Sequence, residues 1–428
     1  MVSTGINEQI SNTIVHLCRT ATNKEGDTFV GIKSELIDGQ HQLTVNFPIG
    51  YQISDNEEDV RDEIVQLVTV LQEYNDEQSQ ISTFSNEQLL KTVRFPVQSY
   101  FYVMFDYLNH GEFTIKEDKY AQGTSGPISW SQTIKKEKPI VQKNGFVYPQ
   151  QRVKTHNDTD KDLITEIHRY CVYQSYLKLG WIYNLPLPVK PIRKHDNTTY
   201  LKYLQSKFLQ TNRDSDKKLF QAMLDILNFC NTEDDPKQFY FGTNSFEYVW
   251  ERLIQSTFGN IDKSRFFPKT TWKLRVGVQR ENHPLEPDTI MVSDGDIYIL
   301  DAKYYKYGIS LLPKDLPNSS SINKQISYGE YVATDSKFES ERSNGMQIYN
   351  AFLMPYNMHS APMFSGEKYL AIGEATADWK DYDINPMTYS RIQGILIDVK
   401  SLMSNKIKGN TNEIIALSKA IIESLEKS

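Results

Sequence analysis

Cysteine is scarce in this chain and widely spaced. The 428 residues contain three cysteines, Cys18, Cys171 and Cys230. An odd and scattered set provides neither a disulfide framework nor the closely spaced pairs that bind structural zinc. This usage is typical of a protein in a reducing cytoplasm, which is where we expect it to work.

Features that define other classes of protein are also missing. No apolar run approaches the roughly 18 residues that a membrane-spanning helix needs, and Met1-Val-Ser-Thr leads into a polar stretch instead of a signal peptide. We therefore expect no membrane attachment. The chain lacks Gly-x-x-x-x-Gly-Lys-(Ser/Thr), so it cannot be its own P-loop motor. Its histidines at 16, 168 and 283 have no Cys or Ser partner in a recognisable frame, so nucleophilic catalysis is unsupported.

Positive charge is in the minority. The formal net charge of −7 excludes a globally basic DNA coat. It does not exclude DNA binding, because local charge governs contact with phosphates. The length predicts two or three domains with ample core.

The most informative stretch that is present runs from Pro287 to Lys303. Two apolar, β-prone runs flank a Ser-Asp-Gly-Asp turn, which predicts a tight hairpin. Residues two apart in a strand point to the same face, so Asp301 and Lys303 project together. The hairpin brings Asp288, at the start of its first strand, back beside them.

Two carboxylates and an ammonium at one place favour phosphodiester chemistry. The carboxylates of Asp288 and Asp301 can bind a hard cation such as Mg²⁺, which polarises a phosphoryl oxygen and lowers the pKa of a bound water. Lys303 can orient that water or stabilise the charge developing on phosphorus. The pattern resembles the Pro-Asp…(Asp/Glu)-x-Lys signature of a nuclease superfamily that includes many restriction endonucleases.

Three further Asp-x-Lys matches show that the tripeptide alone carries little information. Asp216–Lys218 lies in a polar helical stretch, and Asp378–Lys380 lies in an acidic loop, 378–383, that we interpret as solvated. Asp398–Lys400 is a real alternative because it also ends a strand. Two observations count against it: no clean hairpin links it to Asp383, and one helix after it is too little to complete an α/β core.

A basic segment lies within residues 110–156. Its aromatic residues Trp130, Phe146 and Tyr148 alternate with positive charge, opposed only by Glu137. This is the best local patch for a nucleic-acid backbone, and a solvated charged surface is an equally good account of it. Its basic residues are Lys135, Lys136, Lys138, Lys143, Arg152 and Lys154.

Hydrophobic periodicity outlines the elements of the first half. We expect strands at Thr28–Lys33 and Gln42–Phe47 around an Asp38-Gly39 turn, and a loop with a short helix at 76–92. Helices are expected at 6–20, about 56–74, Ser99–Leu108, about 160–180 and 197–231.

From residue 237 the order of elements predicts one α/β unit. A helix capped by Ser245 is followed by a strand at Thr271–Gln279 and the hairpin. Helices at Ile322–Ala333 and 343–353, strands at Tyr369–Gly373 and Ile392–Val399, and a helix at 411–426 complete it. A mixed sheet with helices on both faces is the natural packing.

Three stretches together with the hairpin resemble one nuclease family. They are Phe246–Glu251, Asn323–Tyr331 and Gly126–Ile134. The chain is similar to the LlaJI family of type II restriction endonucleases and, more loosely, to the McrC nucleases. The resemblance spans roughly 95–400. It implies an α/β fold, α+β overall, with a C-terminal restriction-endonuclease-like mixed sheet flanked by helices and a mixed N-terminal region with helices before it.

The resemblance also implies roles for residues around the hairpin. Glu247 matches an accessory metal-binding glutamate, with Glu251 one turn further on. Gln325 and Tyr328 match a Gln/Tyr pair on a helix facing the site, and Lys324 could reach a phosphate. The Ala302 carbonyl is a possible further metal ligand.

Taken together, these features predict a Mg²⁺-dependent type II restriction endonuclease that cuts double-stranded DNA. Two ions per site, Mn²⁺ as a substitute, a homodimer or transient dimer, and a separately encoded methyltransferase are expected with it. Residues 1–95 and 96–235 would contact DNA and 236–428 would be the nuclease domain. An McrC-like subunit acting with a separate NTPase and a non-cleaving DNA-binding protein are the alternatives.

Overall fold

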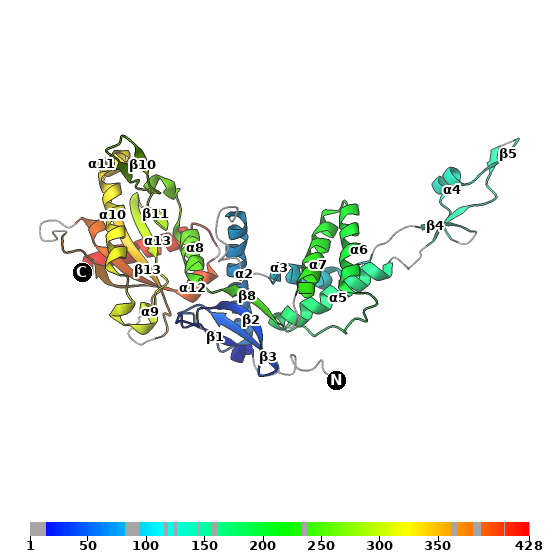
Figure 1. Cartoon of the computed structure of the whole chain (residues 1–428), viewed down its shortest axis with the longest axis horizontal. Coiled ribbons are helices and arrows are strands. Elements are labelled where there is room, and N and C mark those ends of the chain that lie inside the picture. The colour runs from blue at the N-terminus through cyan, green and yellow to red at the C-terminus, as the bar shows by residue number, and fades with distance from the viewer. Residues whose placement is uncertain are drawn as a thin grey trace. The chain divides into compact units, whose positions relative to one another are not determined.

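The computed structural model describes residues 14–81, 95–114, 119–123, 126–143, 145–155, 161–232, 238–360, 366–379, 387–405 and 407–427. The chain divides into two compact units (Figure 1). One contains residues 1–93 together with 238–428, and the other contains residues 94–237.

A five-stranded mixed sheet forms the centre of the first unit. β11 and β12 pair antiparallel, β12, β13 and β15 are parallel, and β14 is antiparallel to β15. The strands, in their order across the sheet, are β11 (Thr289–Ser293), β12 (Asp296–Ala302), β13 (Ile348–Tyr356), β15 (Ile392–Asp398) and β14 (Tyr369–Ala375).

Helices cover both faces of this sheet. Ile297 and Ile299 of β12 pack with Tyr328 and Val332 of α10 (Ser319–Thr334). The intervening Tyr298 side chain hydrogen-bonds to Ser418 of α13 (Thr411–Lys427). Because alternate residues of a strand face opposite sides, α10 and α13 lie on opposite faces (Figure 1). The predicted mixed sheet flanked by helices is confirmed.

The segment 343–353, expected to be a helix, is instead mostly the central strand β13. All nine residues from Ile348 to Tyr356 are buried. A strand covered on both faces is a continuous apolar run without alternation, and periodicity does not distinguish such a run from a buried helix. The strand expected at Thr271–Gln279 is also corrected. β9 (Thr271–Lys273) and β10 (Gln279–Glu281) form a separate hairpin outside the main sheet.

A second sheet in the same unit joins the two ends of the chain. The expected Asp38-Gly39 turn is confirmed, since both residues have positive φ. β8, which precedes α8 (Phe246–Phe258), pairs with β2, and Gly31 lies opposite Gly242 where an added Cβ would strike the facing backbone. The strands in spatial order are β1 (Cys18–Thr20), β3 (Gln40–Phe47), β2 (Val30–Ile37) and β8 (Phe239–Thr243).

This sheet changes the expected organisation, because residues 14–81 pack with 238–427 and are not a separate region. The helix expected at 6–20 is also corrected. Residues 14–20 form a 3-10 turn, η1 (Ile14–Leu17), and β1, while 6–13 lie outside the described residues. The expected helix at 56–74 is α2 (Glu57–Ile81), longer than predicted, and residues 82–92 of the expected loop lie outside the described residues.

Shorter elements complete the first unit. Ser245 stands at the N-cap of α8, but among the described contacts its side chain makes no capping hydrogen bond, so the predicted cap is wrong. Its amide instead donates to Thr243 Oγ1 over 3.0 Å. The remaining elements are η4 (Lys263–Phe266), α9 (Tyr307–Ser310), η5 (Pro313–Asp315), η6 (Ser336–Phe338), α11 (Glu339–Ser343), η7 (Thr388–Ser390) and α12 (Val399–Ser404).

The second unit is mainly helical. The helix expected over 197–231 is two helices, separated at Thr211–Arg213. Among the described residues, none of the helices of either unit is long and apolar enough to cross a bilayer. The unit contains α3 (Val97–His110), β4 (Lys119–Gln122), α4 (Trp130–Lys136), β5 (Ile140–Gln142), β6 (Gly145–Val147), β7 (Arg152–Thr155), α5 (Lys161–Leu179), η3 (Gly180–Tyr183), α6 (Asn197–Gln210) and α7 (Asp214–Thr232).

Candidate active site

The β11–β12 hairpin brings the three predicted residues together. Thr289 pairs with Leu300, so Asp288 lies one step beyond that pair, opposite Asp301. Asp294 and Gly295 have φ of 51° and 88°, as a two-residue turn requires. The turn therefore fixes the register that places the two carboxylates side by side.

Short contacts hold the three side chains. The amide of Ala302 donates to Asp288 Oδ2 over 2.9 Å. Lys303 Nζ lies 2.7 Å from Asp301 Oδ2, and Asp301 is only 5% exposed. Ala302 thus positions Asp288 through its N–H, while a role for its carbonyl as a ligand stays a prediction.

The electrostatics of the cluster show that the carboxylates of Asp288 and Asp301 repel each other. Burial, the Asp301 carboxylate and a hydrogen bond with it raise the pKa of Asp288 to about 8. Burial opposes the charge of Lys303, but the carboxylates of Asp301 and Asp288 outweigh it and raise the pKa of that ammonium above its usual value. Lys303 is therefore charged at neutral pH, and the two acids together need a proton or a cation.

The side chains at the site fit a hard divalent ion that takes few of its ligands from the protein. Among the described residues, no three acidic, histidine or cysteine side chains converge as a complete metal cage. Mg²⁺ in phosphate-processing sites takes one or two carboxylates and completes its shell with water and substrate phosphate. The paired, repelling carboxylates of Asp288 and Asp301 match that requirement.

Glu251 of α8 interacts electrostatically with the cluster. Burial and the charge of Asp301 raise the pKa of Glu251, while Lys303 opposes them. Glu251 in turn raises the pKa of Asp288, whereas the Glu247 side chain is exposed. The two lie one turn apart on α8, so the rotation of α8 about its axis determines which of them faces the cluster.

Of the residues predicted on α10, Gln325 and Tyr328 are buried and Lys324 is exposed. Gln325 is fully buried, and its amide donates to the Ile299 carbonyl over 2.7 Å and to Asn350 Oδ1 over 3.3 Å. These bonds fasten α10 to β12. Tyr328 donates to the Glu286 carbonyl over 2.7 Å, and burial with the charges of Asp288 and Asp301 raises its pKa. Lys324 is exposed beside the Tyr328 ring.

Sequence reasoning missed Lys263. Its Nζ donates to the carbonyls of Pro287 and Asp288 over 3.3 and 3.0 Å. It also lowers the pKa of Glu251 against the effect of burial. A lysine 25 residues before Asp288 carries no local signal of this contact.

The N-terminal segment contacts Tyr304, the residue that follows Lys303. The Ile49 amide donates to the Tyr304 hydroxyl over 2.8 Å, and Tyr304 follows Lys303 directly. The Tyr304 ring packs on Phe246 of α8, and Trp250 Nε1 donates to the Leu353 carbonyl, which also accepts the Lys303 amide. Segments from three parts of the chain thus fix the backbone around Lys303.

The competing Asp398–Lys400 pair has a structural role. Asp398 caps α12 by accepting from the Ser401 amide over 2.9 Å. Lys400 binds Glu63 of α2 over 2.6 Å. Asp216 lies at the start of α7, Asp378 is exposed, and residues 380–383 lie outside the described residues.

The basic segment is exposed in part and paired in part. Lys135, Lys136, Lys138 and Lys143 are exposed around α4 and the β5–β6 hairpin. Arg152 is bound by Glu137 over 2.6 Å. The side chain of Lys154 lies outside the described residues. DNA binding through this segment stays a prediction.

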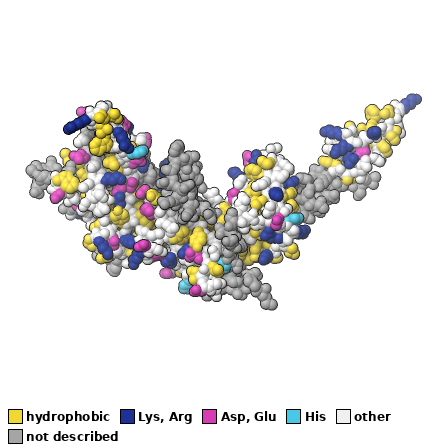
Figure 2. Space-filling model, in the orientation of Figure 1, with side chains coloured by type: hydrophobic (Ala, Val, Ile, Leu, Met, Phe, Trp, Pro, Cys, Tyr) yellow, Lys and Arg dark blue, Asp and Glu magenta, His cyan; other side chains and the backbone are white. Residues whose placement is uncertain are grey.

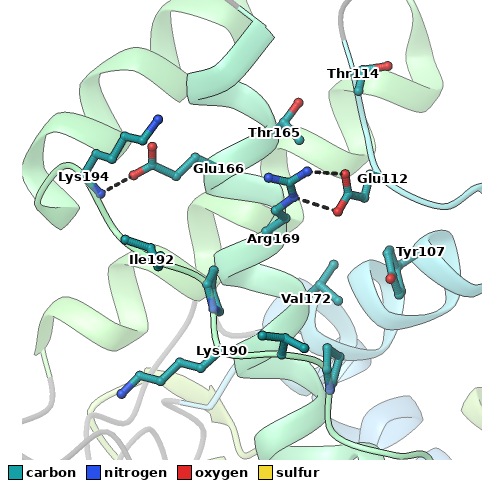
Figure 3. A pocket seen from close by; sticks show the side chains of 13 residues that line it. Tyr107, Glu112, Thr114, Thr165, Glu166, Arg169, Val172, Lys190, Ile192 and Lys194 are labelled. Atoms are coloured by element: carbon teal, nitrogen blue, oxygen red, sulfur yellow. Dashed lines mark hydrogen bonds and ion pairs between the residues drawn. The ribbon is translucent and has the colours of Figure 1, made fainter.

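The helical unit also has an open pocket of about 900 Å³ between α5 and the proline-rich segment Pro188–Lys194 (Figure 3). Several of its charged groups have partners. Arg169 makes two bonds of 2.7 Å to Glu112, and Glu166 accepts from the Lys194 amide over 2.7 Å. These pairs indicate a structural arrangement at this pocket.

Comparison with known proteins identifies the family of the chain. No curated protein matches the sequence. Among solved structures, a chain from a complex of Thermococcus gammatolerans McrB AAA+ hexamers with bound McrC is similar at a TM-score of 0.38 and 12% identity, covering 92% of this chain and 83% of that one. The family model of the LlaJI restriction endonuclease matches residues 29–375. The chain therefore belongs to the LlaJI restriction endonuclease family, and is a nuclease of a restriction system.

Proposed function

We propose that the protein is a Mg²⁺-dependent type II endonuclease that hydrolyses double-stranded DNA at a specific sequence. The observation that carries this proposal is the pair of repelling carboxylates, Asp288 and Asp301, with an ammonium 2.7 Å from Asp301. Two carboxylates that share one ammonium are costly at neutral pH. A metal ion would supply the further positive charge, and a phosphodiester would complete its coordination shell.

Each residue has a definite part in this proposal. Asp288 and Asp301 would hold the metal, with Glu251 as the accessory acid and two ions as the expected complement. The ion would polarise the phosphoryl oxygen and acidify a bound water. Lys303 orients the attacking water and stabilises the charge that develops on phosphorus. Lys263 and the Ala302 amide keep Asp288 in place.

Plasmid digestion tests the proposal. We expect discrete fragments with Mg²⁺ or Mn²⁺ and none with chelator. Asp301→Ala and Lys303→Ala should each slow cutting about a thousandfold, since each removes several kcal/mol of charge stabilisation. Asp398→Ala is the matched control because it changes the competing Asp-x-Lys pair, and it should cut like the wild type at a temperature where it is folded.

The same assay separates the alternatives. An McrC-like subunit would cut only with its separate NTPase, and a non-cleaving DNA-binding protein would bind without cutting. A smear without discrete bands would contradict sequence specificity.

Cutting both strands needs two sites, so mass photometry on DNA should show a homodimer or a transient pair. A separately encoded methyltransferase would protect the host DNA.

A further inference from the structure

The β9–β10 hairpin projects from the nuclease unit without a protein partner. All residues from 269 to 283 are exposed, so neither face of the hairpin packs on the described parts of the chain. An isolated two-stranded hairpin is at best marginally stable in water. Yet this one exposes large apolar side chains, with exposed fractions of 62% for Trp272, 80% for Val276 and 55% for Val278.

The hairpin carries positive charge that forms no ion pair within the described chain. Its four basic residues are opposed by Glu281 and, at its base, by Glu286. Within the described chain none of the four has an ion-pair partner, although Arg265 just before the hairpin is paired with Glu341 over 2.6 Å. Figure 2 shows Lys and Arg side chains beside hydrophobic ones where Figure 1 labels β10. The four are Lys269, Lys273, Arg275 and Arg280.

The register divides these side chains between two faces. Trp272 pairs with Arg280, and Leu274 binds Val278 through its amide at 2.9 Å, so one face combines apolar groups with an arginine. Lys273 pairs with Gln279 on the other face. Arginine, lysine and glutamine are side chains that read base edges, and the major groove admits a two-stranded ribbon.

The base of the hairpin is fixed to the candidate active site. The Leu285 amide donates to the Pro268 carbonyl over 3.0 Å and closes the base three residues before Asp288. Tyr328 holds the Glu286 carbonyl and Lys263 holds those of Pro287 and Asp288. From Leu285 to Val278 the extended chain spans up to roughly 23 Å, at about 3.3 Å per residue. A ligand on the hairpin therefore lies within about one turn of B-form DNA, roughly 34 Å, from the carboxylates.

We propose that the β9–β10 hairpin is a DNA-binding arm that enters a groove of the duplex beside the cleaved phosphate. The proposal rests on the proposed nuclease function, and it assigns the reading of the flanking DNA to this arm. Duplex DNA is the occupant that satisfies both the unpaired positive charge and the exposed tryptophan. A second copy of the chain is the competing occupant, and the oligomeric state tests it.

Anisotropy with a labelled duplex in chelator measures binding without cutting. The triple variant Lys273→Ala/Arg275→Ala/Arg280→Ala should weaken binding at least tenfold. It should also lower the slope of log affinity against log salt by up to about 3, at about 0.9 per phosphate contact. The matched control, Lys408→Ala/Lys419→Ala/Lys427→Ala, removes the same charge from exposed positions of the same unit and should stay within about twofold.

Cutting separates this inference from the proposed function. With Mg²⁺, the triple variant should need at least tenfold more DNA than the wild type to reach half of its maximal single-turnover rate, whereas the control variant should need the same DNA concentration as the wild type. If the wild type cuts DNA but the triple variant binds like the control, the arm is refuted and the nuclease function stands. If the wild type neither binds nor cuts DNA, both fail.

Crosslinking tests the placement directly. Val276→Cys carrying a photoreactive maleimide should crosslink to the duplex, and Lys419→Cys should not. Light scattering tests the competing occupant. A dimer that Trp272→Ala dissolves, with no change in DNA affinity, would make the hairpin an interface between copies and overturn the proposal.

Discussion

Asp288 and Asp301 face each other in a partly buried place, where Lys303 and the Ala302 amide offset their charge. Like charges this close cannot both ionise freely, so Asp288 holds a proton to unusually high pH. A site that is costly without its ligand is typical of catalytic centres, which trade stability for activity. Removing one carboxylate should therefore stabilise the protein while abolishing its chemistry.

The change Asp288→Asn tests this trade in thermal unfolding with chelator. The pKa of Asp288 is raised to about 8 from 3.8, so the folded state binds more protons than the unfolded state between those values. Wild-type stability must then fall as pH rises from about 4 to about 8. Asn cannot ionise and still accepts from Ala302, so its advantage should grow with pH to roughly 1–3 kcal/mol. An advantage independent of pH would contradict the coupling.

Glu251→Gln and Glu247→Gln form a matched pair on one helix. Glu251 acts electrostatically on Asp288 and is acted on by Asp301, whereas Glu247 is exposed. We expect Glu251→Gln to reduce the rate of plasmid cutting about 10- to 100-fold, or about 1.4–2.7 kcal/mol, and Glu247→Gln to have less than a twofold effect. The reverse order of effects would restore the assignment made from the sequence.

The contrast between these two residues shows what a local pattern can encode. Asp288, Asp301 and Lys303 could be placed together because strand alternation and a tight turn fix their relative positions. Glu247 and Glu251 differ only in how α8 is rotated against the sheet, which depends on packing partners such as Leu353, far away in sequence. Lys263 was missed for the same reason.

At the scale of elements, local pattern was sufficient where one face of a helix is exposed and where a tight turn marks a hairpin. α10, α13 and the β11–β12 hairpin were predicted close to their observed bounds. β13 was missed because burial on both faces removes the alternation that marks a strand. The β9–β10 hairpin was read as one strand because its turn, Leu274–Val278, is rich in β-branched residues, and only Gly277 marks the reversal.

The α10–β12 contact should depend on Gln325 and not on its neighbour. Gln325→Leu leaves the Ile299 carbonyl and Asn350 Oδ1 without this donor in a buried place, which should cost about 2–4 kcal/mol of unfolding free energy in urea. Lys324→Ala, on the exposed side of the same helix, should change it by less than about 0.5 kcal/mol.

Cutting per folded molecule distinguishes support from chemistry at Gln325. Because the amide is engaged with the backbone of β12, we expect Gln325→Leu to keep at least a tenth of the wild-type rate below its unfolding temperature. A loss near that of Lys303→Ala, with normal stability, would show that Gln325 acts on the substrate.

At the scale of the whole molecule, the ends of the chain form one unit. β8 adds to the N-terminal sheet, Ile49 binds Tyr304, and Glu63 binds Lys400 from 337 residues away. No local sequence pattern predicts contacts over such distances, so the sequence predicts a separate N-terminal region. Its observed part is to support the backbone behind Lys303. A part in DNA recognition stays a prediction for this region and for 96–235.

The Glu63–Lys400 pair offers a test of this organisation by calorimetry. Two compact units predict two unfolding transitions, with residues 1–93 and 238–428 melting together. Lys400→Met removes the cation from Glu63, which is 5% exposed and keeps Ser54 as a donor, so the loss should be about 2–3 kcal/mol. Only the transition of the first unit should shift.

Because Lys400 is structural in this account, the Lys400→Met variant should still cut plasmid below its lowered transition. Lys419→Met, on the exposed surface of α13, controls for the loss of one charge and should leave both transitions in place. A variant that folds with both transitions unchanged but no longer cuts would move the active site to Asp398 and Lys400. A third transition would separate residues 1–93 from the nuclease sheet and return them to the independent region expected from the sequence.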